Sequence, residues 1–151
     1  MAALGVVRNL GKLALPGANG GIMIIGIGVD LVDVRRFESI IYRWQHRFLK
    51  RVFTDTEIRY CNTKKHPAQR FATRFAAKEA FIKALFPKEQ EGIRFSDIEI
   101  GERDQRPFVT LSGRVKELAE KHNISKIHLM LSHDGDYGIA NVVLEGSQPP
   151  K

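Results

Sequence analysis

Residues 23–30 begin with a nearly continuous apolar run, Met-Ile-Ile-Gly-Ile-Gly-Val, which ends abruptly at Asp30. A run of this kind, rich in Ile and Val, predicts a β-strand that is buried on both faces. We therefore expect Asp30 at the end of this strand, at the rim of a hydrophobic core. Asp33 follows closely, just before the first helical pattern.

Residues 34–48 have apolar residues at intervals of three and four, which is the spacing of an amphipathic helix. The residues expected to face the core are Val34, Phe37, Ile41, Trp44 and Phe48. A short helix from Thr54 to about Cys61 is predicted next, because Thr54 and Glu57 have the spacing of a capping box.

A long helix is predicted to begin near Pro67 and to end at Pro87. The remaining elements are a strand at 95–100, a strand at 107–111, a helix at 114–122 and strands at 126–131 and 137–144. The short turns between successive strands predict two antiparallel hairpins. The fold class is therefore expected to be α+β, with antiparallel β hairpins packed against helices.

A chain of 151 residues has the length of one domain. Residues 1–22 lie outside the pattern described above, and we expect the domain to cover residues 23–146, with a short tail at 147–151. The N-terminal segment has two interpretations. It is a disordered or misassigned extension, which its composition favours, or an organellar targeting peptide.

The composition is that of a globular protein, with 43% hydrophobic and 27% charged residues. The apolar runs are shorter than the roughly 20 residues of a membrane span, so no membrane insertion is expected. Cys61 is the only cysteine, which excludes an internal disulfide and fits a cytoplasmic protein. The net charge of +7 predicts an anionic partner but does not identify it.

Much of this positive charge lies on the helix predicted at 34–48 and just after it. Arg36, Arg43, Arg47 and Lys50 form a basic stripe beside the apolar one, and Ile40 lies within it. Most stripes of this kind are simply solvated. An aliphatic residue flanked by arginines is also what a small acidic helical partner would bind.

Glu79 and Lys83 are four residues apart on the long helix, in a segment otherwise apolar enough to be buried. Taken alone, such a pair is most often a solvated ion pair. Asp30 offers a second carboxylate beside a buried element. Two carboxylates can bind a hard cation such as Mg²⁺ together with a phosphate, although the sequence alone does not show that Asp30 and Glu79 meet.

Three motifs together resemble the holo-[acyl-carrier-protein] synthases of the 4'-phosphopantetheinyl transferase superfamily, over residues 23–145. They are Gly-Ile-Gly-Val-Asp at 26–30, Arg-Phe-Ala-Ala-Lys-Glu-Ala at 74–80 with Lys83, and Leu-Ser-His at 131–133. The resemblance implies transfer of 4'-phosphopantetheine from coenzyme A to a serine of apo-acyl carrier protein, leaving adenosine 3',5'-bisphosphate. It also implies a homotrimer with coenzyme A between subunits.

By this resemblance Asp30 and Glu79 are the ligands of Mg²⁺ and, with Lys83, the catalytic residues. Lys83, Arg74, Ser132 and His133 would bind coenzyme A, the co-substrate. The basic stripe would receive the carrier protein through Arg36, Ile40, Arg43 and Arg47. The group that removes the serine proton stays open, with a metal-bound water and a carboxylate of the carrier as alternatives. Residues 85–92 depart from the glycine-containing loop that is common in the family.

Two alternative functions remain at this point. A basic α+β domain of this size also suits a nucleic-acid-binding module, although the basic stripe lacks interleaved exposed aromatic residues and no RNA-binding motif is present. The other alternative is a relative that binds partners without catalysis. The presence of both Asp30 and Glu79 argues against it.

Overall fold

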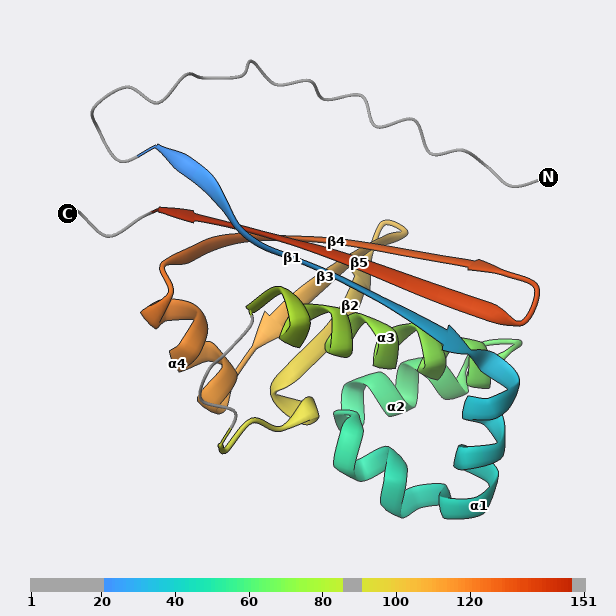
Figure 1. Ribbon diagram of the computed structural model, residues 1–151. Coiled ribbons are helices and arrows are strands. Elements are labelled where there is room, and N and C mark those ends of the chain that lie inside the picture. The colour runs from blue at the N-terminus through green and yellow to red at the C-terminus, as the bar shows by residue number, and fades with distance from the viewer. Residues whose placement is uncertain (1–20, 86–90, 148–151) are drawn as a thin grey trace.

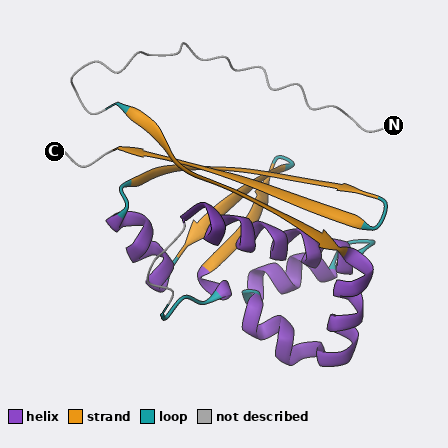
Figure 2. Ribbon diagram, viewed as in Figure 1, coloured by secondary structure: helices purple, strands orange, loops and turns teal. Residues whose placement is uncertain are grey.

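The computed structural model describes residues 21–85 and 91–147. The elements are, in chain order, β1 (Ile22–Asp33), α1 (Val34–Val52), α2 (Asp55–Asn62), α3 (Pro67–Leu85), the 3-10 turn η1 (Phe95–Asp97), β2 (Ile98–Arg103), β3 (Arg106–Leu111), α4 (Gly113–Lys121), β4 (Ile124–Asp134) and β5 (Tyr137–Ser147). Figures 1 and 2 show the helices beneath a long sheet. The predicted α+β class is confirmed.

The strands form two antiparallel sheets, one of three strands in the order β1-β5-β4 and one hairpin of β2 and β3. Helix α3 lies along one face of the three-stranded sheet (Figure 1). Gly26 and Gly28 of β1 touch the backbone of α3, and a Cβ atom built on Gly28 would lie 1.9 Å from the carbonyl oxygen of Ala80. Glycine is therefore required where this strand meets the helix.

The prediction that β1 is buried on both faces is wrong for the single chain. On the side away from α3, Ile24, Ile27, Val29 and Leu31 are 56%, 61%, 50% and 63% exposed. Successive side chains of a strand point to opposite faces, and α3 covers only one of them. The register with β5 shifts between Ile24 and Gly26, which keeps Ile24 and Ile27 on the same outer face.

Strand β1 is also longer than predicted, so Asp30 lies within the strand and not at its end. Asp33 ends the strand and caps α1, where its carboxylate accepts hydrogen bonds from the amides of Arg35 and Arg36 at 2.9 and 3.2 Å. The Asp33 side chain thus has a structural partner at the start of the helix.

Helix α1 has the predicted apolar stripe only in part. Phe37 is buried and its ring packs against Phe48, Phe53 and Phe75, with centroids 5.3 to 6.4 Å apart. Trp44 is 60% exposed, so its predicted place in the core is wrong. The spacing predicts on which face of the helix a side chain lies. The aromatic cluster around Phe37 does not extend as far as Trp44, so Trp44 stays exposed.

The other predicted elements are found with small changes. The capping box of Thr54 and Glu57 is present, and α3 begins at Pro67. Residues 95–97 form η1 where a strand was expected. The expectations for residues 1–20, for Pro87 with the loop at 86–90 and for residues 148–151 lie outside the described residues.

No helix in the described ranges combines the length and the hydropathy needed to cross a bilayer. Both long helices, α1 and α3, carry several charged residues.

Candidate active site

Asp30 and Lys83 meet where β1 packs against α3. The ammonium of Lys83 donates a hydrogen bond to the carboxylate of Asp30 at 2.6 Å and another to the carbonyl of Val29 at 3.2 Å. The Asp30 side chain is only 17% exposed, whereas that of Lys83 is half exposed. The ion pair depends on the glycines of β1, because a larger residue there would hold α3 away from the strand.

Glu79 lies one helical turn before Lys83 and is partly buried. Burial raises the pKa of Glu79, the neighbouring Asp30 raises it further, and Lys83 opposes the shift. The structure thus brings Asp30, Glu79 and Lys83 together. The local ion pair considered for Glu79 and Lys83 is not the one formed, because Lys83 binds Asp30 across the strand–helix contact.

Asp30 and Glu79 are carboxylates, the groups that bind a hard cation, whereas Lys83 is itself a cation and pairs with Asp30. The pKa of Glu79 is raised by burial first and then by the negative charge of Asp30. Within residues 21–85 and 91–147 no cluster of three or more acidic, His or Cys side chains is placed to hold a metal. Mg²⁺ is commonly bound in this way, by one or two carboxylates together with water and substrate phosphates.

Ser132 and His133 lie near the end of β4, at the same end of the sheet as Asp30 but not next to the carboxylates. Leu131 pairs with Ala140 of β5, which pairs with Asp30 of β1. Ser132 is the next residue along β4, and β5 lies between β4 and β1. Since neighbouring strands lie about 4.8 Å apart, Ser132 is two such spacings away from β1. Both side chains are exposed. One chain alone therefore does not direct them to Asp30 and Glu79.

Arg74 is on α3 but points elsewhere. It is 2% exposed, and its guanidinium lies over the ring of Tyr60 in α2, 4.2 Å from the centroid. At about 100° per residue, Arg74 and Glu79 are roughly 140° apart around the helix. In the described part of the chain, Nε of Arg74 and the hydroxyl of Tyr60 have no hydrogen-bond partner. The structure does not bring Arg74 to the carboxylates.

The basic stripe of α1 lies on the surface, with Arg36, Arg43 and Arg47 exposed and Ile40 partly buried. Beside it is a cavity of about 830 Å³. Its lining residues are Ile40, Trp44, His46, Arg47, Phe48, Lys50 and Arg51. The helical spacing does not predict this cavity, because it places Trp44 in the core.

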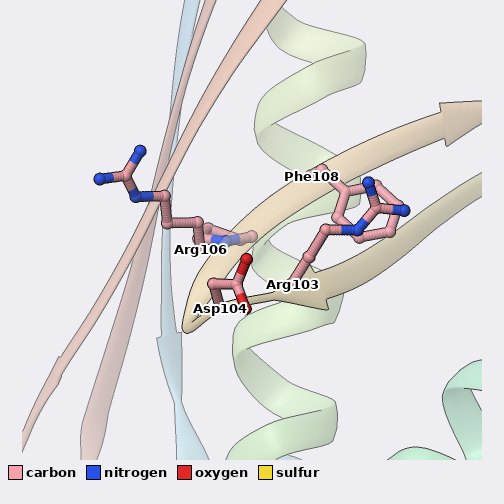
Figure 3. Close-up of a pocket in the computed structure, with 5 residues that line it drawn as sticks. Arg103, Asp104, Arg106 and Phe108 are labelled. Carbon is pink, nitrogen blue, oxygen red and sulfur yellow. The ribbon is translucent and has the colours of Figure 1, made fainter.

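A second cationic pocket, of about 540 Å³, lies at the tip of the β2–β3 hairpin (Figure 3). Arg103, Asp104, Arg106, Pro107 and Phe108 line it, and the guanidinium of Arg103 lies 5.8 Å from the ring centroid of Phe108. The hairpin turns through positive φ angles at Asp104 and Gln105. The pocket shares no residue with the carboxylate cluster.

A comparison with known families identifies the class of protein. The model of the 4'-phosphopantetheinyl transferase superfamily matches residues 26–142, and the chain therefore belongs to this superfamily. Among its relatives is the holo-[acyl-carrier-protein] synthase of Geotalea daltonii, which is 46% identical over 124 residues. The match covers 82% of this chain and 99% of the relative. The resemblance inferred from the three motifs is confirmed.

Solved structures agree with this assignment. The holo-ACP-synthase from Plasmodium yoelii superposes with a TM-score of 0.74 at 31% identity, covering 85% of this chain and 99% of that one. The Helicobacter pylori holo-[acyl-carrier-protein] synthase, solved in complex with coenzyme A, gives a TM-score of 0.68 at 35% identity. That match covers 78% of this chain and 98% of the other.

The raised pKa of Glu79 makes a prediction about stability. The folded protein keeps the Glu79 proton to a higher pH than the unfolded chain does, so the free energy of unfolding falls as the pH rises from the ordinary glutamate pKa through the raised one. Glu79→Gln removes this loss. We expect the variant to melt at a higher temperature than the wild type at neutral pH, and at the same temperature below a pH of about 4.

Thermal unfolding followed by circular dichroism across this pH range, in buffer with a chelator, checks the prediction. Glu102→Gln is a matched control, because Glu102 is exposed at the end of β2, away from Asp30. A Glu79→Gln variant that is less stable than the wild type at neutral pH would contradict the electrostatic picture.

Proposed function

We propose that the protein transfers 4'-phosphopantetheine from coenzyme A to a serine of apo-acyl carrier protein, giving holo-acyl carrier protein and adenosine 3',5'-bisphosphate. The observation that carries this proposal is the cluster of Asp30, Glu79 and Lys83 in a chain of this superfamily. Relatives named holo-[acyl-carrier-protein] synthase and a neighbour solved with coenzyme A support it.

The reaction substitutes one oxygen of a phosphate for another, and catalysis of this kind depends on positioning and on neutralising charge. Asp30 and Glu79 would hold Mg²⁺, which would neutralise charge on the diphosphate of coenzyme A. Lys83 would donate to a phosphate or to the leaving group. The Lys83 side chain is half exposed and its ammonium already lies against Asp30, so a phosphate bound beside Asp30 would be close to it.

We further propose that the site is completed in a homotrimer. The outer face of the β1-β5-β4 sheet exposes Ile24, Ile27, Val29 and Leu31, and Met130 and Ile139 continue this apolar surface. Contiguous apolar surface of this kind is typical of interfaces. An assembly is also a physical route by which Ser132 and His133, which lie apart from the carboxylates of their own chain, would contribute to coenzyme A binding. Arg74 is buried against Tyr60, so assembly alone would not expose it.

The basic stripe of α1 is the proposed docking surface for the carrier protein. Arg36, Arg43 and Arg47 supply positive charge, Ile40 an apolar contact, and the neighbouring cavity adds the exposed Trp44. Among the described residues that line this cavity none is acidic. The combination suits an acidic helix that is attracted by charge and held by apolar contacts.

The wider setting follows from the same proposal. The transferase domain would cover residues 23–146, and the protein would act in the cytoplasm, in lipid metabolism and fatty acid biosynthesis. A buried free thiol at Cys61 is compatible with a reducing compartment.

The first prediction concerns the carboxylates. Glu79→Gln and Asp30→Asn should each lower transfer by about a hundredfold or more, because each removes charge that the reaction needs while keeping the side-chain volume. The measurement is intact mass of apo-acyl carrier protein after incubation with the protein, coenzyme A and Mg²⁺. Glu102→Gln serves as the control. Full activity of Glu79→Gln would refute its role, and no transfer by the wild type would refute the proposed function.

The second prediction concerns docking. Arg36→Glu and Arg43→Glu should raise the apparent KM for the carrier by about tenfold or more, with little effect on the KM for coenzyme A. The difference should shrink at high salt, because exposed charges are screened. Lys116→Glu on α4 is the control, since it makes the same charge reversal on another exposed surface.

A nucleic-acid-binding protein would behave differently in the same experiment. It would bind nonspecific DNA or RNA with an affinity that falls steeply with salt, and it would not modify the carrier. An unchanged carrier KM in Arg36→Glu would remove Arg36 from the docking surface.

The third prediction concerns assembly. Leu31→Asp places a charge on the exposed apolar face, so the protein should then have the mass of one chain instead of three and lose transfer activity. Light scattering after size-exclusion chromatography measures the mass. Tyr42→Asp is a control on α1, where another exposed hydrophobic side chain lies outside this face. A wild type that has the mass of one chain would refute the homotrimer.

A further inference from the structure

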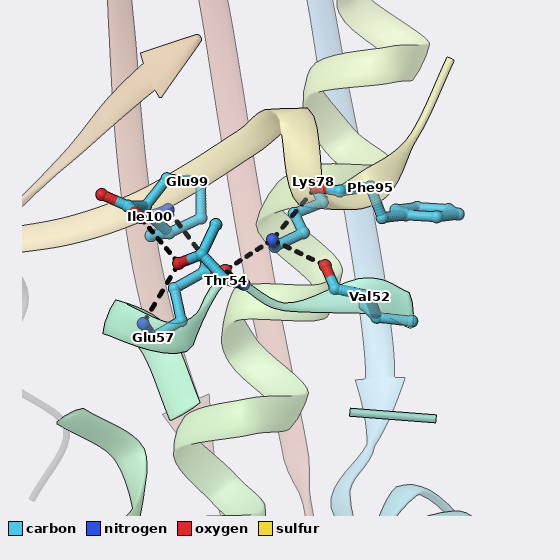
Figure 4. Close-up of polar contacts among 7 residues, drawn as sticks. All are labelled: Val52, Thr54, Glu57, Lys78, Phe95, Glu99 and Ile100. Atoms are coloured by element: carbon cyan, nitrogen blue, oxygen red, sulfur yellow. Dashed lines mark hydrogen bonds and ion pairs between the residues drawn. The ribbon is translucent and has the colours of Figure 1, made fainter. Parts of the chain in front are cut away.

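Lys78, which precedes Glu79 on α3, is fully buried with an exposed fraction of 0%. Lysine is rarely buried completely unless its charge is paired. Its ammonium does not face the carboxylate cluster. Figure 4 shows it directed away from the sheet, toward the segment that joins α1 to α2 and toward η1. The mechanism proposed above makes no use of this residue.

The ammonium of Lys78 has three hydrogen-bond acceptors, and each comes from a different segment. It donates to Oε2 of Glu57 at 2.7 Å, to the carbonyl of Val52 at 2.9 Å and to the carbonyl of Phe95 at 3.1 Å. These acceptors belong to α2, to the last residue of α1 and to η1. An ammonium has three protons, so every donor of Lys78 is used.

Glu57, the partner of Lys78, is bound equally completely. Its Oε2 also accepts from the amide of Thr54 at 2.9 Å, and its Oε1 accepts from the amide of Ile100 in β2 at 2.9 Å. The hydroxyl of Thr54 donates to Glu99 at 2.6 Å. One buried ion pair thus connects α1, α2, η1 and β2 to a single point on α3 (Figure 4).

The β1 strand holds α3 from another side. Cβ atoms on Gly26 and Gly28 would lie 1.8 and 1.9 Å from the carbonyl oxygens of Ala84 and Ala80, so strand and helix are in direct backbone contact. That contact fixes the distance between α3 and β1. The rotation of α3 about its own axis is held by other contacts, namely the packing of Phe71, Phe75 and Phe81 in the core and the directional hydrogen bonds of Lys78.

We propose that Lys78 is a positioning residue, whose buried ammonium fixes the rotation of α3 so that Glu79 faces Asp30. Lys78 and Glu79 are adjacent, about 100° apart around the helix, so a rotation at one is a displacement at the other. The inference rests on the proposed function, because it concerns the catalytic role of Glu79. The hydrogen bonds of Lys78 go to neither Asp30 nor Glu79.

If Lys78 had a purely structural role, replacing it would lower the stability of the protein but leave the kcat of the folded molecules unchanged. Lys78→Met leaves the charge of Glu57 buried without a positive charge beside it, so the stability of this variant should fall. The double variant Lys78→Met/Glu57→Gln removes both charges and keeps the volumes similar. Replacing both members of a buried ion pair is often tolerated, so the double variant is the main test.

The experiment measures kcat and both KM values for transfer to apo-acyl carrier protein, at a temperature where circular dichroism shows each variant to be folded. We expect kcat of the double variant to fall by about ten- to a hundredfold, because small misplacements of catalytic groups have effects of this size. The KM for the carrier should change little, since the exposed arginines of α1 are intact.

Leu118→Ala is the matched control, because it removes buried volume from α4 without touching α3's polar contacts. Its folded molecules should keep the wild-type kcat. A double variant with the wild-type kcat would refute the positioning role, as would an equal loss of kcat in Leu118→Ala. A wild type without transfer activity would instead refute the proposed function, so the two failures are distinguishable.

Discussion

The direct backbone contact between β1 and α3 is the constraint on which the site depends. At Gly26 and Gly28 the strand approaches the backbone of α3 at Ala84 and Ala80, with no side chain of the strand between them. At this distance Lys83 reaches both the carboxylate of Asp30 and the carbonyl of Val29. Asp30 and Glu79 come from distant parts of the chain, and small residues allow the approach that brings them together.

On another side of α3, the buried ion pair of Lys78 and Glu57 holds the helix. The alanines of α3 allow the close approach of β1, while Phe71, Phe75 and Phe81 of the same helix pack in the core. The buried pair of Lys78 and Glu57 is specific in direction, because its hydrogen bonds go to Val52, Phe95 and Ile100 in separate elements. A buried ion pair contributes little net stability compared with apolar packing, so its value here lies in geometry.

The three-stranded sheet is covered by helix on one face only. Its inner face packs Ala140, Val142 and Leu144 of β5 against α3 and the rest of the core, whereas its outer face leaves the aliphatic residues of β1 in solvent. A strand that is apolar on both faces is stable in water only when something covers both. The proposed assembly would cover the outer face of β1, which accounts for a sequence pattern typical of a buried strand.

The sequence by itself determined the local structure: the strands, the helices, the capping box of Thr54 and Glu57, and the motifs that identify the superfamily. These follow from interactions between residues close in the chain. The tertiary structure alone decided that Lys83 pairs with Asp30, that Asp33 caps a helix, that Arg74 lies against Tyr60 and that Trp44 is exposed. Periodicity gives the direction of a side chain along its own element. What lies opposite depends on how distant elements pack, and a local pattern carries no information about that.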